Sequence, residues 1–219
     1  MLPNYAQKME EVRNDIVTMA KFAYESLKLS YEGLKNSDVA LFESARSNRV
    51  KHLGYLANGV DNNIVIALAL YTPEASELRA LIALLKSTNE LMRIGNAAKS
   101  YAAGMEEAIK QGINIEPLKP FISELHLSAM RSVEALIHLL EDFSMDSYRA
   151  IMVEEDKSDE LATLLQKEIV DRLMDQQESL PSYLKLLRRI RKLEKAVDST
   201  ENIAKLLMYA NEGGKIEFN

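Results

Sequence analysis

Most of this chain carries apolar residues at helical spacing, and few residues interrupt the pattern. Between Tyr5 and Gly33 the apolar positions are typical of one face of a helix: Met9, Val12, Ile16, Met19, Ala20, Ala23 and Leu27. Only 8 Gly and 5 Pro occur among the 219 residues, so the helices can be long. No segment shows the alternating pattern of a strand over more than a few residues. The sequence therefore predicts an all-α fold.

Residues typical of helix ends divide this pattern into six long helices. We expect them at about residues 5–33, 38–71, 72–112, 117–141, 144–178 and 181–209. The second helix carries Gly54, Asn58 and Gly59 near its middle, which favours a bend there. For the third helix, Thr72 is the expected N-cap and Pro73 the first helical residue.

One linker separates the six helices into two sets of three. The segment 112–117, Gly-Ile-Asn-Ile-Glu-Pro, lies near the midpoint of the chain and is the only convincing linker. Each half then consists of three long helices joined by short turns. We therefore predict two tandem antiparallel three-helix bundles, one in residues 1–113 and the other in residues 114–219.

Composition excludes several classes of protein. Cysteine is absent, so the chain has no disulfide framework and no thiolate site. A net charge of -6 argues against general binding of nucleic acid. No apolar run approaches the roughly 20 residues of a membrane span, and the segment 1–5 does not resemble the start of a signal peptide. We expect a cytoplasmic protein.

The two halves contain a degenerate internal repeat. The segment Glu90–Asn96 aligns with the segment Lys192–Asp198. The second copy holds Glu194 and Asp198 four residues apart, whereas the first copy holds Met92 and Asn96 at those positions. A further acidic pair, Glu155 and Asp159, precedes the second copy. If the two acidic pairs lie on facing helices, only the second half can gather four carboxylates.

Several segments resemble the motifs of one known family. Residues 73–79 resemble its Pro-x-Ala-x-Asp-Leu-Arg motif, and residues 93–96 resemble the end of its Leu-Glu-Arg-Ile-Gly-Asp motif. Residues 193–204 resemble the longer form Leu-Glu-Arg-Ile-Gly-Asp-His-Ala-x-Asn-Ile-Ala, and residues 155–159 resemble the acidic motif of the preceding helix. In order and spacing these segments resemble the PhoU family of phosphate-uptake regulators, over essentially the whole chain.

The resemblance implies a function and partners. PhoU proteins are tandem three-helix bundles, often dimeric, so a homodimer is expected. They are not enzymes: they restrain phosphate-starvation signalling when phosphate is plentiful, beside the ATPase subunit of the high-affinity phosphate transporter and its sensor histidine kinase. Association with the membrane would be peripheral at most. Three alternatives stay open: an accessory protein of a low-affinity phosphate transporter, a metal-storage or metal-dependent hydrolytic protein, and a plain coiled-coil scaffold.

The acidic pairs are the candidate metal ligands. Residues four apart share one helix face, so Glu155 lies beside Asp159 and Glu194 beside Asp198. The repulsion within each pair becomes coordination if a cation binds, and oxygen ligands favour Mg²⁺, Mn²⁺ or iron, with Ca²⁺ as a further option. Members of the family often carry metal clusters on such motifs. The alternative is that both pairs are solvated faces of charged helices.

Other charged residues receive structural interpretations. The neighbouring acids are expected to be surface charge, although Asp156 could assist a metal site: Glu154, Asp156, Glu160 and Glu201. In the first half, Met92 and a valine from the stretch 50–54 would fill the equivalent place, so we expect no metal cluster in that bundle.

A basic run precedes and overlaps the second copy of the repeat: Arg188, Arg189, Arg191, Lys192 and Lys195. These positions span nearly a full helical turn, so they cannot all point into a core. They form either a solvated face balanced by the acidic fifth helix or a contact surface for an acidic partner or membrane headgroups.

Overall fold

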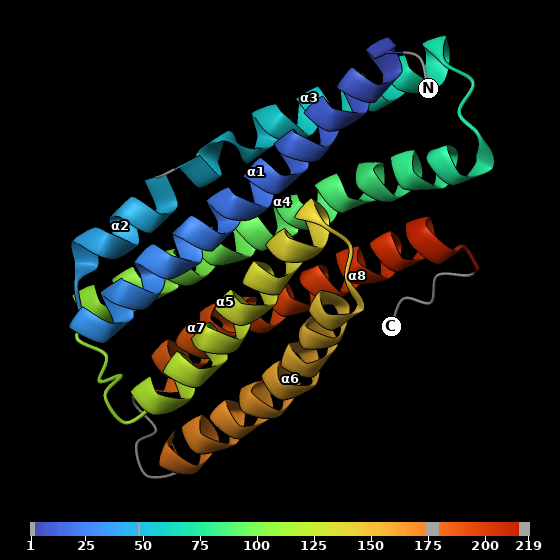
Figure 1. Cartoon of the computed structure of the whole chain (residues 1–219). Helices are drawn as coiled ribbons and strands as arrows, with labels where there is room; N and C mark the ends of the chain where they lie inside the picture. Colours follow the sequence, from blue (N-terminus) through green and yellow to red (C-terminus); the bar gives the residue numbers. More distant parts are fainter. Residues whose placement is uncertain (1–2, 48, 174–179, 215–219) are drawn as a thin grey trace.

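A computed structural model describes residues 3–47, 49–173 and 180–214 of the chain, and these residues are almost entirely helical (Figure 1). The helices are α1 (Pro3–Asn36), α2 (Val39–Ser47), the 3₁₀ helix η1 (Arg49–His52), α3 (Leu53–Leu70), α4 (Ala75–Lys110), α5 (Lys119–Glu141), α6 (Met145–Leu173), α7 (Leu180–Ile190) and α8 (Lys192–Glu212). No strand occurs in these described ranges. The prediction of an all-α fold is confirmed.

Two of the six predicted helices are divided. The second consists of α2, η1 and α3, and its irregular part lies at Arg49–His52, before the stretch 54–59 that the sequence favours for a bend. The sixth consists of α7 and α8, with Arg191 between them. Backbone bonds cross this second break, since the Arg191 amide donates to the Leu187 carbonyl at 2.9 Å and the Lys195 amide donates to Arg191 at 3.2 Å. The direction of the chain is therefore kept through the break.

The start of α4 differs from the prediction. Its N-cap is Glu74 rather than Thr72, and the Glu77 side chain accepts a hydrogen bond from the Glu74 amide at 3.0 Å. The Glu74 side chain in turn accepts from the backbone at Glu77, which completes a capping box. Glu74 has the extended backbone of a cap, with ψ of 165°, so Pro73 lies outside the helix. A reciprocal pair of hydrogen bonds therefore replaces the expected Thr-Pro start.

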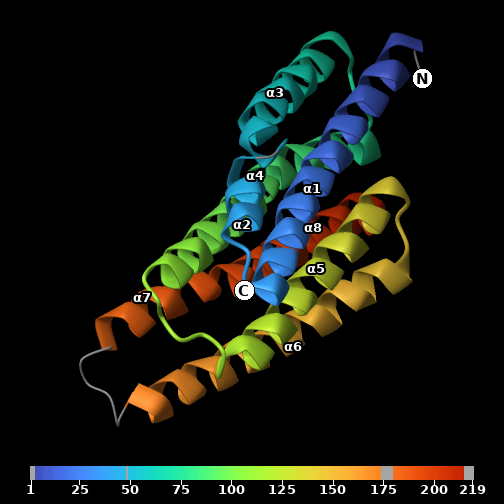
Figure 2. The ribbon, with the colours of Figure 1, turned by 90° about the vertical axis from the view of Figure 1, so that its left-hand side faces the viewer.

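The helices form two sets that meet along equivalent members. In the first set α1 packs against α2, α3 and α4, and in the second α6 packs against α5 and α8. Between the sets, α4 packs on α8 and α1 on α5, and each of these pairs runs antiparallel (Figures 1 and 2). The first and third helices of one set thus pair with the first and third helices of the other. The predicted boundary at residues 113 and 114 falls in the loop between α4 and α5, and the division into two domains stays a prediction.

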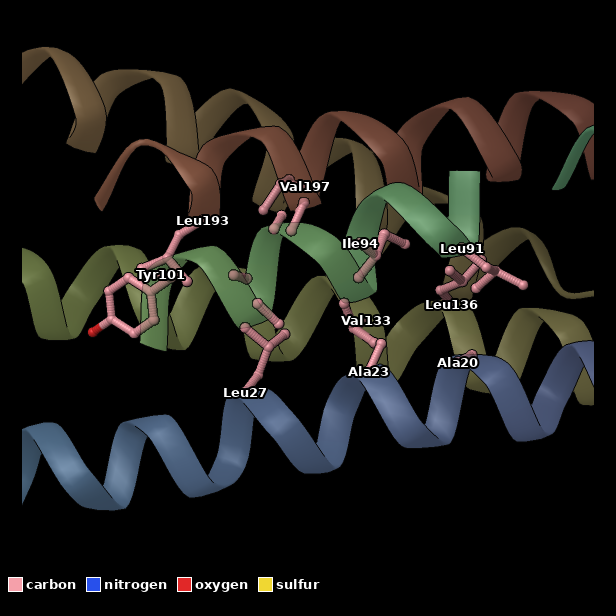
Figure 3. Packing of buried hydrophobic residues seen from close by; sticks show 14 of the residues in the cluster. Ala20, Ala23, Leu27, Leu91, Ile94, Tyr101, Val133, Leu136, Leu193 and Val197 are labelled. Carbon is pink, nitrogen blue, oxygen red and sulfur yellow. The ribbon is translucent and has the colours of Figure 1, made fainter. Parts of the chain in front are cut away.

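One continuous hydrophobic core joins the two sets. Figure 3 shows the residues where α1, α4, α5 and α8 converge: Ala20, Ala23, Leu27, Leu91, Ile94, Tyr101, Val133, Leu136, Leu193 and Val197. All of these side chains are fully buried. Because apolar residues from both halves fill the same volume, the halves stabilise each other as a single packed body.

A buried histidine lies within this core. The His126 Nε2–H donates to the Leu27 carbonyl at 2.9 Å, and the ring contacts Tyr101 and Tyr31 edge-on at centroid distances of 4.8 and 5.3 Å. Its Nδ1 has no hydrogen-bond partner in the described part of the chain. Burial lowers the pKa of His126 to about 4, so the ring is neutral at physiological pH.

Helices α4 and α7 approach each other at Gly104. A Cβ atom on this residue would lie 2.3 Å from both Cβ and Cγ of Arg189. No real Cβ occupies such a position, and the atoms it would meet are close to the α7 backbone rather than at a flexible tip. Only glycine therefore permits this separation between α4 and α7.

The outer face of α3 is apolar and exposed. Tyr55, Val65 and Leu70 are 81%, 59% and 71% exposed. By length and composition alone, the stretch Val39–Leu70 could cross a membrane, a criterion that core helices of soluble proteins also meet. Exposed apolar surface of this kind is typical of a face that contacts a partner protein or a membrane.

The close approach at Gly104 predicts opposite effects of two alanine substitutions. Gly104→Ala should lower the free energy of unfolding by about 1 kcal/mol or more, because overpacking outweighs the higher helix propensity of alanine. Gly54→Ala should raise it by about 0.5–1 kcal/mol, because its Cβ meets only the Met92 methyl at 3.9 Å. Urea unfolding followed by circular dichroism measures both. A Gly104→Ala variant as stable as the wild type would contradict the packing described.

The buried histidine predicts a loss of stability in acid. Unfolding lets His126 take up a proton below pH 6.5, whereas the folded protein resists protonation down to about pH 4. The free energy of unfolding should therefore fall as the pH drops from 6.5 to 4, by about 3 kcal/mol from this residue. His126→Gln should flatten the dependence in that window, and His138→Gln, at an exposed position, should leave it unchanged. Equal slopes for the two variants would contradict the prediction.

Candidate metal centre

Helices α6 and α8 pack together and bring their acidic residues to one place. Asp159 of α6 and Glu194 and Asp198 of α8 each offer a carboxylate oxygen, and these oxygens all lie within 4.8 Å of one another. The two α8 residues share a helix face because they are four apart. Three of the four residues proposed from the sequence therefore form a compact group.

The fourth residue, Glu155, lies one helical turn before Asp159 and outside this compact group. Burial raises the pKa of Glu155 above its usual range, and the charges of Glu201, Asp159, Asp156 and Asp198 raise it further. The electrostatic coupling shows that Glu155 belongs to the same negative region. The acidic cluster thus extends along the seam between α6 and α8.

Glu201 is part of this region, although the sequence interpretation treated it as surface charge. It is only 7% exposed, and its strongest described contact is an ion pair with Lys205 at 2.8 Å. Its charge acts on Glu155 across the seam. The spacing contained the signal: Glu201 lies three residues after Asp198 and seven after Glu194, which is the repeat of a single helix face.

Basic side chains balance the cluster. Arg191 donates two hydrogen bonds to Glu194, at 2.9 and 3.2 Å, and Lys195 lies 3.2 Å from Glu194 and 2.7 Å from Asp198. Burial opposes the charge of Glu194, which is 5% exposed, but these partners outweigh burial and lower its pKa. Part of the predicted basic run, Arg191 and Lys195, therefore neutralises the acids. For these two residues, neither a solvated face nor an external contact surface is a full description.

The donor set fits a hard cation. Two oxygens bound to one cation lie at most twice the metal–oxygen distance apart, which is about 5 Å for Ca²⁺ and about 4.2 Å for Mg²⁺. The three carboxylate oxygens lie within 4.8 Å of one another, a separation that satisfies Ca²⁺, whereas Mg²⁺ requires them to draw slightly closer. Burial raises the pKa of Asp159, and the charges of Glu194 and Asp198 raise it further, while Lys195 and Arg191 offset only part of this rise. A bound cation would relieve this repulsion. Proton and metal would compete for the same oxygens, so metal affinity should fall in acid.

The corresponding place in the first half is occupied differently. The Met92 methyl lies 3.9 Å from the position of a Cβ on Gly54, so α4 and α3 are in apolar contact there. Met92 is half-buried and packs against the core. Asn96 is exposed and faces α8 rather than α3. The arrangement agrees with a methionine that fills the gap, and the expectation that no metal binds in this half stays a prediction.

The remaining acids of α6 divide into two kinds. Glu154 accepts hydrogen bonds from Arg131 at 2.6 and 3.1 Å, and its side chain is half-buried against α5, so the interpretation as surface charge was wrong for this residue. Asp156 and Glu160 are exposed, as expected. Asp156 contributes to the field at Glu155 but is not among the three clustered ligands.

Known proteins share this architecture. The family model described as the PhoU domain matches residues 16–105. The phosphate-specific transport system accessory protein PhoU homolog of Streptococcus pneumoniae serotype 4 is 25% identical over 215 residues, 97% of each chain. The phosphate-specific transport system accessory protein PhoU of Escherichia coli K12 is 23% identical over 209 residues, 94% of this chain and 84% of that one.

Two crystal structures have the same fold. PhoU from Pseudomonas aeruginosa superposes with a TM-score of 0.86 at 22% identity, covering 96% of this chain and 100% of that one. The phosphate transport system regulatory protein PhoU from Streptococcus pneumoniae gives a TM-score of 0.83 at 21% identity, covering 97% and 99%. The domain match, the relatives aligned over nearly the full length and the tandem helical fold together support the PhoU family for this chain.

Proposed function

We propose that this protein is a non-enzymatic regulator of phosphate uptake and of phosphate-starvation signalling. It would act in the cytoplasm through contact with the phosphate ABC transporter and its sensor histidine kinase. The observation that carries the proposal is the similarity over 97% of both chains to a relative named as an accessory protein of the phosphate-specific transport system. Because the similarity spans both halves, the whole bundle pair would serve this role.

Expression of a phosphate-starvation reporter tests the proposal. Deletion of the gene should give high alkaline phosphatase activity in cells grown with plentiful phosphate, because the restraint on the sensor kinase is lost. The wild-type gene on a plasmid should restore the low level. A reporter that stays low in the deletion strain would contradict the role as a regulator and would favour a scaffold or another transport system.

We also propose that Asp159, Glu194 and Asp198 bind a divalent cation or iron, with Glu155 as an additional ligand or source of negative charge. Support comes from the separation of the three carboxylate oxygens, from the raised pKa of Asp159 and from the all-oxygen donor set. The basic partners of Glu194 supply the compensating charge when no metal is bound. A metal ion that binds would therefore displace the Lys195 and Arg191 side chains from the carboxylates, because these side chains already balance the negative charge.

Metal titration of amide variants tests this site. Asp159→Asn and Glu194→Gln keep the shape of each side chain but remove a charged ligand, so each should weaken Mn²⁺ binding by about 100-fold or more. Glu160→Gln changes an exposed carboxylate on the same helix and should leave the affinity unchanged. Isothermal titration calorimetry on protein stripped of metal measures all three. Equal affinity in the wild type and both ligand variants would rule the site out.

A lysine variant should act in the opposite direction. Lys195→Gln removes a cation that competes for Glu194 and Asp198, so Mn²⁺ should bind about 2- to 10-fold more tightly. The matched control is Lys185→Gln, whose partner Glu107 lies on α4 at 2.6 Å, away from the cluster. Weaker binding in Lys195→Gln would mean that the lysine supports the site instead of competing for it.

A further inference from the structure

A polar groove runs along the seam where α4 meets α8, beside the acidic cluster. It encloses about 560 Å³, and Ala97 and Ser199, both buried, lie among its lining residues. The other lining residues are all polar: Arg93, Asn96, Ser100, Lys192, Lys195, Asp198 and Asn202. Volumes of this order hold small ligands in other proteins.

The groove is built from equivalent positions of the two halves. In the alignment of the internal repeat, Arg93 corresponds to Lys195 and Asn96 to Asp198. Continued along the helices, the alignment pairs Ser100 with Asn202. All of these residues line the groove, so the antiparallel pairing of α4 with α8 creates it where the two copies of the repeat face each other. The groove therefore exists only because the halves are docked.

The difference between the two copies gives the groove its charge. Among the described lining residues, Asp198 is the one carboxylate, against the three cations Arg93, Lys192 and Lys195. The equivalent of Asp198 in the first half is Asn96, which is neutral. An acid at this position would bring a second negative charge into the groove. Its replacement by an amide leaves a positive groove that also offers hydrogen-bond donors.

Two cations form no salt bridge within the described ranges: Lys192, which lines the groove, and Arg189, which lies at its end and acts on Glu107 through its charge alone. Lys192 is exposed and forms no ion pair with any residue that the structure describes. Arg189 reaches the end of the groove, where its Nη1–H donates to Ser100 Oγ at 2.8 Å, and within the described ranges it forms no salt bridge. Arg93 has an external partner, Glu90, at 2.9 Å, and is 69% exposed. An anion in the groove would thus find uncompensated positive charge.

We propose that this groove binds an inorganic phosphate anion, either orthophosphate or a short polyphosphate. Guanidinium, ammonium, hydroxyl and amide groups together are the donors that recognise phosphate oxygens. None of the lining residues in the described part of the chain is aromatic, so these residues offer no surface on which a nucleobase would stack. The site would let the protein respond to phosphate directly. It requires neither a bound metal nor the regulatory partners.

Binding of phosphate to metal-free, full-length protein tests the proposal. Orthophosphate and tripolyphosphate are titrated separately by calorimetry, and ³¹P line broadening follows the same samples. Saturable binding of at least one of the two anions is expected. Comparison of the two titrations shows whether the groove prefers orthophosphate or the polyphosphate. Lys192→Gln breaks no described ion pair, and it should weaken binding about tenfold. Asn96→Asp restores an acid to the groove and should weaken binding by a similar factor.

Two control variants make the same chemical changes elsewhere. Lys167→Gln on α6 and Asn58→Asp on α3 alter exposed residues that are not among the lining residues of the groove, so they should leave the affinity unchanged. Failure of both anions to bind the wild type would overturn the proposal, and so would equal affinity in the groove variants and their controls. Because these titrations use no metal and no partner, their failure is distinguishable from failure of the regulatory role.

Discussion

The packing of α4 is the contact on which the rest of the structure depends. On one side α4 covers α1, α2 and α3, and on the other it covers α7 and α8. Gly104 lets α7 approach it closely, and the buried Ala98 and Ala102 are further small residues on its surface. Because its apolar side chains enter a core that both halves share, neither half could keep this core if α4 were withdrawn. The relative positions of the groove and the acidic cluster follow from the same contact.

The charges on α8 connect these two sites. Lys195 is shared: it neutralises Glu194 and Asp198 in the cluster, and it also lines the groove. A cation bound at the cluster would take over the two carboxylates and leave the lysine free to interact with an anion. Metal and phosphate would then favour each other's binding through one side chain, by a coupling that works equally in both directions.

The two halves keep one framework and divide the chemistry between them. In the second half, the positions equivalent to Met92 and Asn96 are the acids that face α6. In the first half, the methionine packs beside Gly54 and the asparagine faces the groove. The first half therefore needs no balancing cations at these two positions. Apolar packing of the methionine takes the place of ion pairs at one position, and the neutral asparagine removes a negative charge at the other.

Helical periodicity and the scarcity of glycine and proline were sufficient to predict the all-α fold, because they depend on local backbone preference and on one apolar face per helix. The i, i+4 spacing likewise predicted which carboxylates share a face. Tertiary packing decided everything that needs a second helix: the docking of α4 on α8, the burial of Glu201, and the approach of Asp159 on α6 to Glu194 and Asp198 on α8. These depend on distances between segments far apart in the chain, which no local pattern specifies. The groove between the repeats is the clearest case, since each copy supplies only half of its lining.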